Sequence, residues 1–252
     1  MKSVVIAGYL RSPFCFAGKG ELVKIRPDDM AAEIVRALVA RSKLDPALIE
    51  DLIVGCAFPE GEQGLNVARL IGLRAGLPIS VAGLTVNRFC GSSMQSIHIA
   101  AGSIQLGAGE AFICAGVESM SRIPMSGFNP MPNPDLAEQM PGAYMGMGQT
   151  AENVARQYKI TRKEQEEFAV ASHQRAAAAR ATGKLADEIT AVGGVTQDGC
   201  IRPETTAEKL AELKLAFDDK GSVTAGTSSP LTDGAAATLV TSEEFARMHK
   251  LP

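Results

Sequence analysis

The strongest constraint on the fold is an alternation of short apolar segments with amphipathic segments across the first 119 residues. Four apolar segments, rich in β-branched residues and bounded by turn-forming residues, are typical of buried strands: SVVIAGY, DLIVGCAF, AGLTVNR and EAFICAGVE. Segments with helical character separate them. Because successive strand–helix–strand units form parallel pairs, the alternation predicts a parallel sheet flanked by helices.

Two of the intervening helices have clear sequence signals. Residues 27–29, Pro-Asp-Asp, place a proline early in a helix and two acids near the positive end of its dipole. Met30, Ile34 and Leu38 then recur every four residues and predict a buried face. The segment at 66–76 predicts a second helix.

The alternation stops at Ser119. Residues 120–148 hold six of the ten methionines and five of the thirteen prolines, and no helical or strand period describes them. A long irregular segment in a compact protein is usually functional or disordered. Because methionine adapts well to apolar ligands, we expect a binding surface there, with a surface insert of no function as the alternative.

A helical region follows the irregular segment. Thr161 and Glu164 form a capping box that starts a helix, which we expect to end at Thr182 before Gly183. The segment DGAAATLVTSEEF then predicts a buried strand that enters a helix. We therefore expect a core domain from residues 1–119 and 232–252, interrupted by an inserted domain at 120–231.

Cys90 lies where a predicted strand gives way to a predicted helix. A helical stripe, spaced by three or four residues, follows it: Met94, Ile97, Ala101, Ile104 and Ala108. Unpaired N–H groups and the positive end of the helix dipole at that position favour thiolate over thiol and can help to hold an oxyanion. The residues alone leave two interpretations open, an activated nucleophile or a buried structural cysteine.

The histidines do not supply a convincing base for Cys90. His98 follows it on the same helix, about 12 Å away at a rise of ~1.5 Å per residue, which is beyond hydrogen-bond reach. His173 falls in the inserted helix, and His249 lies three residues from the end of the sequence. Nucleophilic chemistry at Cys90 would therefore need a base from outside this sequence.

Charge and cysteine usage exclude several classes of protein. A net charge of −3 without a Lys/Arg stripe argues against nucleic-acid binding. No apolar run approaches the roughly 20 residues of a membrane span, and the N-terminal apolar run is too short for a secretory signal, so we expect a cytoplasmic protein. Five cysteines without C-x-x-C pairs predict reduced thiols and no metal site. We expect Cys56 and Cys114 to pack in the core.

Several long motifs resemble, in the correct order, those of the thiolase family. VNRFCGSSMQSIH is similar to the active-site cysteine segment, AGVESMSRIPMS to the strand that leads into the loop domain, MGQTAENVARQY to a loop-domain helix, and FDDKGSVTAGTSSPLTDGAAA to the return to the core. The resemblance covers nearly all 252 residues. It implies an α/β fold with a thiolase-like βαβαβ core, a mixed, mainly parallel sheet flanked by helices, and an inserted, mostly helical loop domain that binds CoA.

The resemblance also implies roles for particular residues. Cys90 would accept the acyl group of a 3-ketoacyl-CoA, release acetyl-CoA and pass the acyl group to a second CoA in a ping-pong scheme. Gly146 stands where several short-chain relatives carry a histidine and therefore favours longer acyl groups. The family's CoA contacts map to five positions: Met147, Ala216, Phe217, Ala225 and Ser229. For the two alanines, ordinary loop packing is the alternative. The hydroxyl of Ser229 is expected to hydrogen-bond an amide of the pantetheine arm.

Thiolases consist of two similar halves, and the second supplies a Gly-His-Pro histidine and a second cysteine that this sequence lacks. We therefore expect a first half with its loop domain, inactive on its own. The implied ligands are CoA and acyl-CoA, with no bound cofactor. The implied assembly is a homodimer or tetramer in the full-length protein, and a hydratase/dehydrogenase partner is left open.

The sequence leaves several functions to be separated. The variants IRPETT and TAGTSS favour a degradative 3-ketoacyl-CoA thiolase of fatty acid β-oxidation. A biosynthetic acetoacetyl-CoA thiolase is the near alternative, and a non-catalytic acyl-CoA-binding module is the alternative from another class. A ketoacyl synthase shares the architecture, but the methionine-rich segment and TAENVA argue against it.

Overall fold

The computed structural model describes residues 2–251, which form two compact units. The core unit comprises the described residues up to Phe128, the segment Asp187–Gly199 and the described residues from Leu231 onward. The insertion unit comprises Asn129–Ala186 and Cys200–Pro230. Within residues 2–251, no helix combines the length and the apolar character that crossing a bilayer requires.

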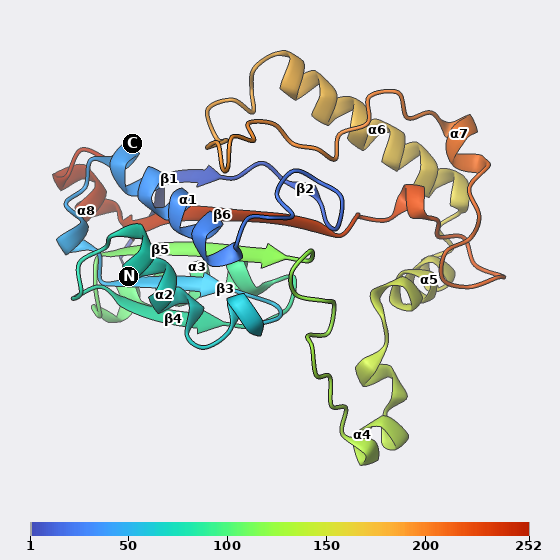
Figure 1. The fold of residues 1–252 in the computed structure, drawn as a ribbon, viewed down its shortest axis with the longest axis horizontal. Helices are drawn as coiled ribbons and strands as arrows, with labels where there is room; N and C mark the ends of the chain where they lie inside the picture. Colours follow the sequence, from blue (N-terminus) through green and yellow to red (C-terminus); the bar gives the residue numbers. More distant parts are fainter. Residues whose placement is uncertain (1, 252) are drawn as a thin grey trace. The chain divides into compact units, whose positions relative to one another are not determined.

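The core unit is built on a six-stranded mixed sheet of described residues, with the strand order β1-β6-β5-β3-β4 and β2 paired to β6 (Figure 1). Both β4 and β5 pair in parallel with β3, whereas β6 runs antiparallel between β1 and β5. The predicted α/β fold with a mixed, mainly parallel sheet is therefore confirmed. The strands are β1 (Val4–Arg11), β2 (Cys15–Phe16), β3 (Asp51–Gly55), β4 (Ala82–Val86), β5 (Ala111–Ser119) and β6 (Thr232–Ser242).

Helices cover both faces of this sheet (Figure 1). Helices α1 (Pro27–Ser42) and α2 (Val67–Ala75) pack on one face, and α3 (Ser92–Leu106) packs on the other. Alternate strand residues serve the two layers, since Leu52 joins the first cluster and Ile53 the second. The predicted apolar face of α1 is fully buried, as expected from its four-residue spacing. The core unit also contains α8 (Glu243–Met248) and the 3-10 turns η1 (Pro46–Leu48) and η2 (Gly61–Gln63).

The buried face of α3 differs from the apolar stripe expected from the sequence. Met94 is 51% exposed, and Ala108 is exposed beyond the end of the helix. The residues turned to the sheet recur every four positions: Ser92, Ser96, Ala100 and Ile104. The reason is the close approach of the helix to Gly55 and Gly116, where only small side chains can be accommodated.

The core unit includes two segments, 120–128 and 187–199, that the sequence analysis placed in the insertion. Arg11, at the end of β1, holds the second segment. Its guanidinium donates to both carboxylate oxygens of Asp198, at 2.7 and 2.9 Å, and to Glu188 at 2.8 Å. Its backbone also exchanges hydrogen bonds with Glu188 and Thr190. These contacts join residues far apart in the sequence, so no local pattern could have placed the boundary.

The insertion unit is mainly helical. Helix α6 (Arg162–Ala181) starts with the predicted capping box and ends before Gly183, whose φ of +75° is typical of a helix stop. The segment expected to be irregular contains α4 (Pro134–Gln139) and the 3-10 turn η3 (Pro141–Tyr144), and leads into α5 (Met147–Tyr158). The remaining elements are α7 (Ala207–Ala211) and η4 (Ala225–Thr227).

Candidate active site

The connections of β3 and β4 leave the carboxyl edge of the sheet on opposite faces. Strand β3 continues into α2 on one face, whereas its neighbour β4 continues into α3 on the other face (Figure 1). Adjacent parallel strands whose connections leave on opposite faces mark a topological switch point, where α/β proteins bind ligands. Cys56 follows β3 at this edge, and the turn that carries Cys90 follows β4.

Cys90 is exposed at the start of α3. Its neighbour Gly91 is the N-cap and has no side chain to cap the helix, so Cys90 lies two residues before the first helical residue, near the positive end of the α3 dipole. Ser92 is buried and stabilises the turn, because its hydroxyl donates to the Phe89 carbonyl at 2.6 Å and accepts from the Arg88 N–H at 2.8 Å. The structure thus places the cysteine of the sequence prediction at the switch point with its side chain accessible.

The remaining cysteines have different surroundings. Cys15, Cys56 and Cys114 are buried, as predicted for the last two, and Cys200 is partly exposed. Burial raises the pKa of the Cys56 thiol to about 12, with a smaller contribution from the nearby Glu118 charge. Burial likewise raises the pKa of Cys114 to about 12. These thiols remain protonated near neutral pH and are poor nucleophiles.

A buried polar network lies beside Cys56 at the same edge. Glu118, near the end of β5, accepts from the Ala57 N–H at 2.8 Å and from Gln63 Nε2 at 2.7 Å. Gln63 also accepts from the Ser119 N–H at 2.7 Å through Oε1. Burial raises the pKa of Glu118, although the hydrogen bonds from Ala57 and Gln63 oppose this effect. The network fixes the residues that follow β3 against the end of β5.

The core-unit histidines do not approach Cys90 in the described residues. His98 is exposed on α3, eight positions after Cys90, about 12 Å along the axis. His249 follows α8 and stacks on Phe245, with ring centroids 4.2 Å apart. In the insertion unit, His173 accepts from the Arg202 N–H at 3.2 Å through Nδ1.

The five positions expected to contact CoA all lie in the insertion unit with exposed side chains. Met147 is the first residue of α5 and is 68% exposed. Phe217 is 44% exposed and packs over Gly148, where a Cβ atom would lie 2.1 Å from its ring. Ala216 donates its N–H to the Val223 carbonyl at 3.0 Å. Ala225 begins η4, and Ser229 is exposed near the end of the unit.

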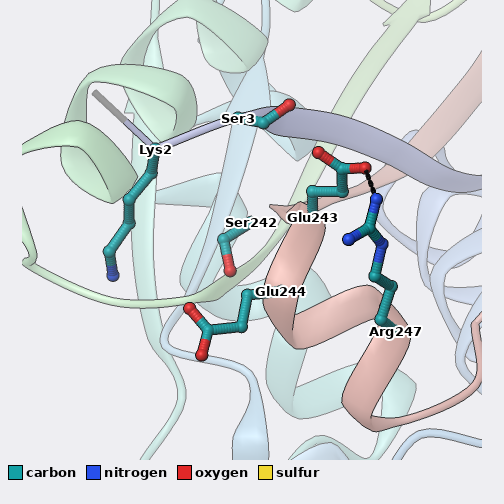
Figure 2. A pocket seen from close by; sticks show the side chains of 6 residues that line it. All are labelled: Lys2, Ser3, Ser242, Glu243, Glu244 and Arg247. Atoms are coloured by element: carbon teal, nitrogen blue, oxygen red, sulfur yellow. Dashed lines mark hydrogen bonds and ion pairs between the residues drawn. The ribbon is translucent and has the colours of Figure 1, made fainter.

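A surface pocket lies at the opposite, amino edge of the parallel strands. Figure 2 shows its lining side chains, which come from the two residues before β1 and from the junction of β6 with α8. Glu243 and Arg247 form an ion pair within it. Because the pocket opens at the end of the sheet away from Cys90, it does not belong to the candidate active site. It is lined by Lys2, Ser3, Ser242, Glu243, Glu244 and Arg247.

Sequence reasoning overlooked the residues that organise this edge. No recognisable sequence motif marks Asn87, Gln63 or Glu118. The position of Glu118 at the end of an apolar strand was the one usable signal. Gly55 and Gly116 were equally inconspicuous until their contact with α3 was seen. No group of three or more His, Cys, Asp or Glu side chains among residues 2–251 is arranged to hold a metal ion.

Comparisons with known proteins agree with this geometry. Residues 4–244 match the family model described as the thiolase N-terminal domain. The 3-ketoacyl-CoA thiolase of Bacillus subtilis is 47% identical, over 98% of this chain and 67% of the relative. That of Shewanella loihica is 45% identical, over all of this chain and 68% of the relative.

Two solved structures are similar along the whole chain. The Bacillus anthracis acetyl-CoA acetyltransferase superposes with a TM-score of 0.87 at 36% identity, over 68% of its own length. The human mitochondrial 3-ketoacyl-CoA thiolase, solved in complex with CoA, has a TM-score of 0.87 at 31% identity, over 67% of its length. The family model, the relatives and the solved structures lead to one conclusion: the chain belongs to the thiolase family.

Proposed function

We propose that this chain carries the acyl-accepting half of a thiolase reaction, with Cys90 as the nucleophile. The observation that carries the proposal is the exposed thiol of Cys90 at the N-terminal end of α3, at the switch point between β3 and β4. Its small neighbours leave room for a substrate carbonyl, and the helix end favours developing negative charge.

The proposed step is balanced as follows. The sulfur of Cys90 forms a bond to the 3-keto carbon of a 3-ketoacyl-CoA, and the bond between carbons 2 and 3 breaks. The electron pair of that bond stays on carbon 2 and takes up the proton that the thiol gives up, which releases acetyl-CoA. The acyl group remains on Cys90 as a thioester until the thiol of a second CoA removes it.

CoA is proposed to bind through the insertion unit, at the positions that the family resemblance indicates. Phe217 and Met147 offer exposed apolar surface for the pantetheine arm, and the small side chains of Ala216 and Ala225 allow it to pass near the backbone. Ser229 offers a hydroxyl for one of its amides. The names of the relatives support 3-ketoacyl-CoA as the substrate class, and the variants IRPETT and TAGTSS favour fatty acid β-oxidation as the setting.

Acylation is the direct test. The chain is incubated with acetoacetyl-CoA, and acetyl adducts on each cysteine are quantified by peptide mass spectrometry. Because His98 and His249 lie away from Cys90, rapid attack needs a base from outside these 252 residues. We therefore expect a slow adduct on Cys90, none in C90A and an unchanged adduct in C200A, with at most one acyl group per chain and no sustained thiolysis. An adduct that is absent from Cys90 after long incubation, or that forms equally in C90A, contradicts Cys90 as the nucleophile, whereas sustained cleavage contradicts the need for an outside base.

The same assay separates the alternatives. Faster acylation by a longer 3-ketoacyl-CoA supports the degradative assignment that Gly146 favours, whereas a preference for acetoacetyl-CoA supports a biosynthetic thiolase. CoA binding by calorimetry without any covalent adduct supports the non-catalytic module. A cytoplasmic location, an assembly of two or four copies and a hydratase/dehydrogenase partner are carried forward as predictions.

Selective alkylation provides an independent test of the nucleophile. Near neutral pH we expect iodoacetamide to modify Cys90 about tenfold faster than Cys200. Cys56 and Cys114 should stay unmodified, because burial raises the pKa of each thiol to about 12. In urea, where burial is lost, all five cysteines should react at similar rates. If folded Cys90 reacts no faster than Cys200, it is not an activated nucleophile.

A further inference from the structure

The turn that carries Cys90 contains a strained residue. Phe89, directly before the cysteine, has a φ of +45°, in the left-handed region that an L side chain rarely adopts. Such a conformation costs about 1–3 kcal/mol and persists only where the surroundings hold it. The Phe89 ring is 64% exposed, and its one ring contact is a tilted one with Phe58 at 6.1 Å, so packing contributes little to holding the residue.

Ser92 holds the carbonyl of Phe89 from the helix side of the turn, and the side chain of Asn87 adds a restraint on its N–H from the strand side. Its Oδ1 accepts the Phe89 N–H at 2.8 Å, which closes an Asx turn over the strained residue. Its Nδ2 donates to the Ala57 carbonyl at 3.0 Å, across the gap between the ends of β4 and β3. One amide therefore ties the turn both to itself and to the neighbouring strand.

The anchor of Asn87 is itself fixed on its other side. The N–H of Ala57 donates to the half-buried Glu118 carboxylate at 2.8 Å, and Gln63 Nε2 donates to that carboxylate at 2.7 Å. A continuous chain of hydrogen bonds thus runs from the end of β5, through Ala57 two residues after β3, to the residue before Cys90. Three strand ends jointly determine the conformation of the turn.

We propose that Asn87 is the positioning residue of Cys90, held in place by the Ala57 peptide group and Glu118. By keeping Phe89 in the left-handed region, Asn87 directs the Cα–Cβ bond of Cys90 toward the N-terminal end of α3. Without it, Phe89 relaxes to an extended or right-handed conformation and the thiol leaves that end. The proposal deepens the function proposed above, since it rests on Cys90 being the reactive thiol.

The test compares N87A with a matched control, N66A. Asn66, the N-cap of α2, makes the same kind of bridge to β4. Its Nδ2 donates to the Gly83 carbonyl at 2.7 Å, and its Oδ1 accepts the Arg69 N–H at 3.4 Å. Alkylation of Cys90 by iodoacetamide is measured relative to Cys200 in the same molecule. We expect N87A to lower this ratio about tenfold and N66A to leave it within about twofold, although both lower the melting temperature.

Two further variants show whether the effect passes through the conformation of Phe89. N87D keeps an acceptor for the Phe89 N–H but cannot donate to Ala57, so we expect an intermediate ratio. In the F89G background the left-handed conformation carries no Cβ penalty, so adding N87A should lower the ratio by only about twofold. These variants also decide the matter if N87A alone fails to fold.

The proposal is overturned if N87A has the wild-type ratio, if N66A lowers the ratio as much, or if N87A has its full effect in F89G. Its failure can be told apart from failure of the proposed function. A Cys90 that accepts no acyl group, yet depends on Asn87 for alkylation, refutes the thiolase step and keeps the positioning role. If Cys90 is acylated, and neither its acylation nor its alkylation changes in N87A, the thiolase step is supported and the positioning role of Asn87 is refuted.

Discussion

Replacing Gly55 by alanine should destabilise the core unit by about 3 kcal/mol, which lowers the melting temperature of a chain of this size by about 9 °C. A Cβ atom at Gly55 would lie 2.3 Å from the backbone nitrogen of Ser93 and 2.4 Å from the carbonyl carbon of Ser92. Both atoms belong to backbone, so no side-chain rotation relieves the overlap. The first turn of α3 must move away from the sheet.

The neighbouring glycine sharpens this prediction. Gly116 pairs with Gly55 in the β3–β5 register, and a Cβ atom there would lie 2.6 Å from the Cβ of Ser93. The two glycines contact the first residues of α3, which begins two residues after Cys90. We therefore expect G55A also to reduce the alkylation of Cys90 relative to Cys200, and G116A to act in the same direction.

Gly102 provides the control on the same helix. It lies in the interior of α3 with nothing within 4 Å of the position that a Cβ atom would take. G102A should therefore stabilise the protein by about 0.5–1 kcal/mol, because alanine favours the helix over glycine. Thermal unfolding measures both variants. Equal melting temperatures for G55A and G102A would show that the approach of α3 to the sheet is not close.

Sequence patterns predicted the elements whose signals are local. The alternation of the first 119 residues identified β1, β3, β4, β5 and the helices between them from the lengths and periods of their apolar segments, although β4, predicted as a buried strand, has only exposed and partly exposed residues. The Thr161–Glu164 capping box located the start of α6 correctly. Cys90 was placed at the start of α3 from the small residues and helical spacing that follow it.

Features that depend on contacts between distant residues escaped the sequence analysis. The position of β6 between β1 and β5 reflects antiparallel pairing across more than a hundred residues. The burial of Ser92 at the start of α3 was set by Gly55 of the sheet, not by the apolar content of the helix. The tie from Glu118 to Asn87 passes through a backbone group of Ala57, which leaves no side-chain pattern.

A large effect is also expected in the insertion unit from E152A. Glu152 lies on α5 and is 1% exposed. Its carboxylate accepts the Ser222 N–H at 2.9 Å and the Val223 N–H at 2.8 Å, and the Ser222 hydroxyl at 3.3 Å. Removing the carboxylate leaves two backbone donors without their charged acceptor, which should cost about 3 kcal/mol.

The loss should be local to one turn. Val223 accepts the Ala216 N–H, and Gly221 approaches the carboxylate so closely that a Cβ atom would lie 2.2 Å from Oε1. Glu152 therefore fixes Ser222 and Val223, and Val223 in turn holds the backbone of Ala216 next to Phe217. We expect E152A to lose hydrogen-exchange protection at Ser222 and Val223, and to weaken CoA binding about tenfold as measured by calorimetry.

Two comparisons separate this prediction from a general loss of charge. Glu167, on α6, makes only a solvent-exposed ion pair with Lys163 at 3.7 Å, so E167A should change stability by less than about 0.5 kcal/mol. E152Q keeps the shape and one acceptor oxygen, and should retain part of the protection. If E152A and E167A give the same exchange at Ser222, the carboxylate does not hold the turn. If protection is lost while CoA binding is unchanged, the turn that carries Ala216 and Phe217 is not part of the CoA site, because binding through that turn requires the conformation that Glu152 maintains.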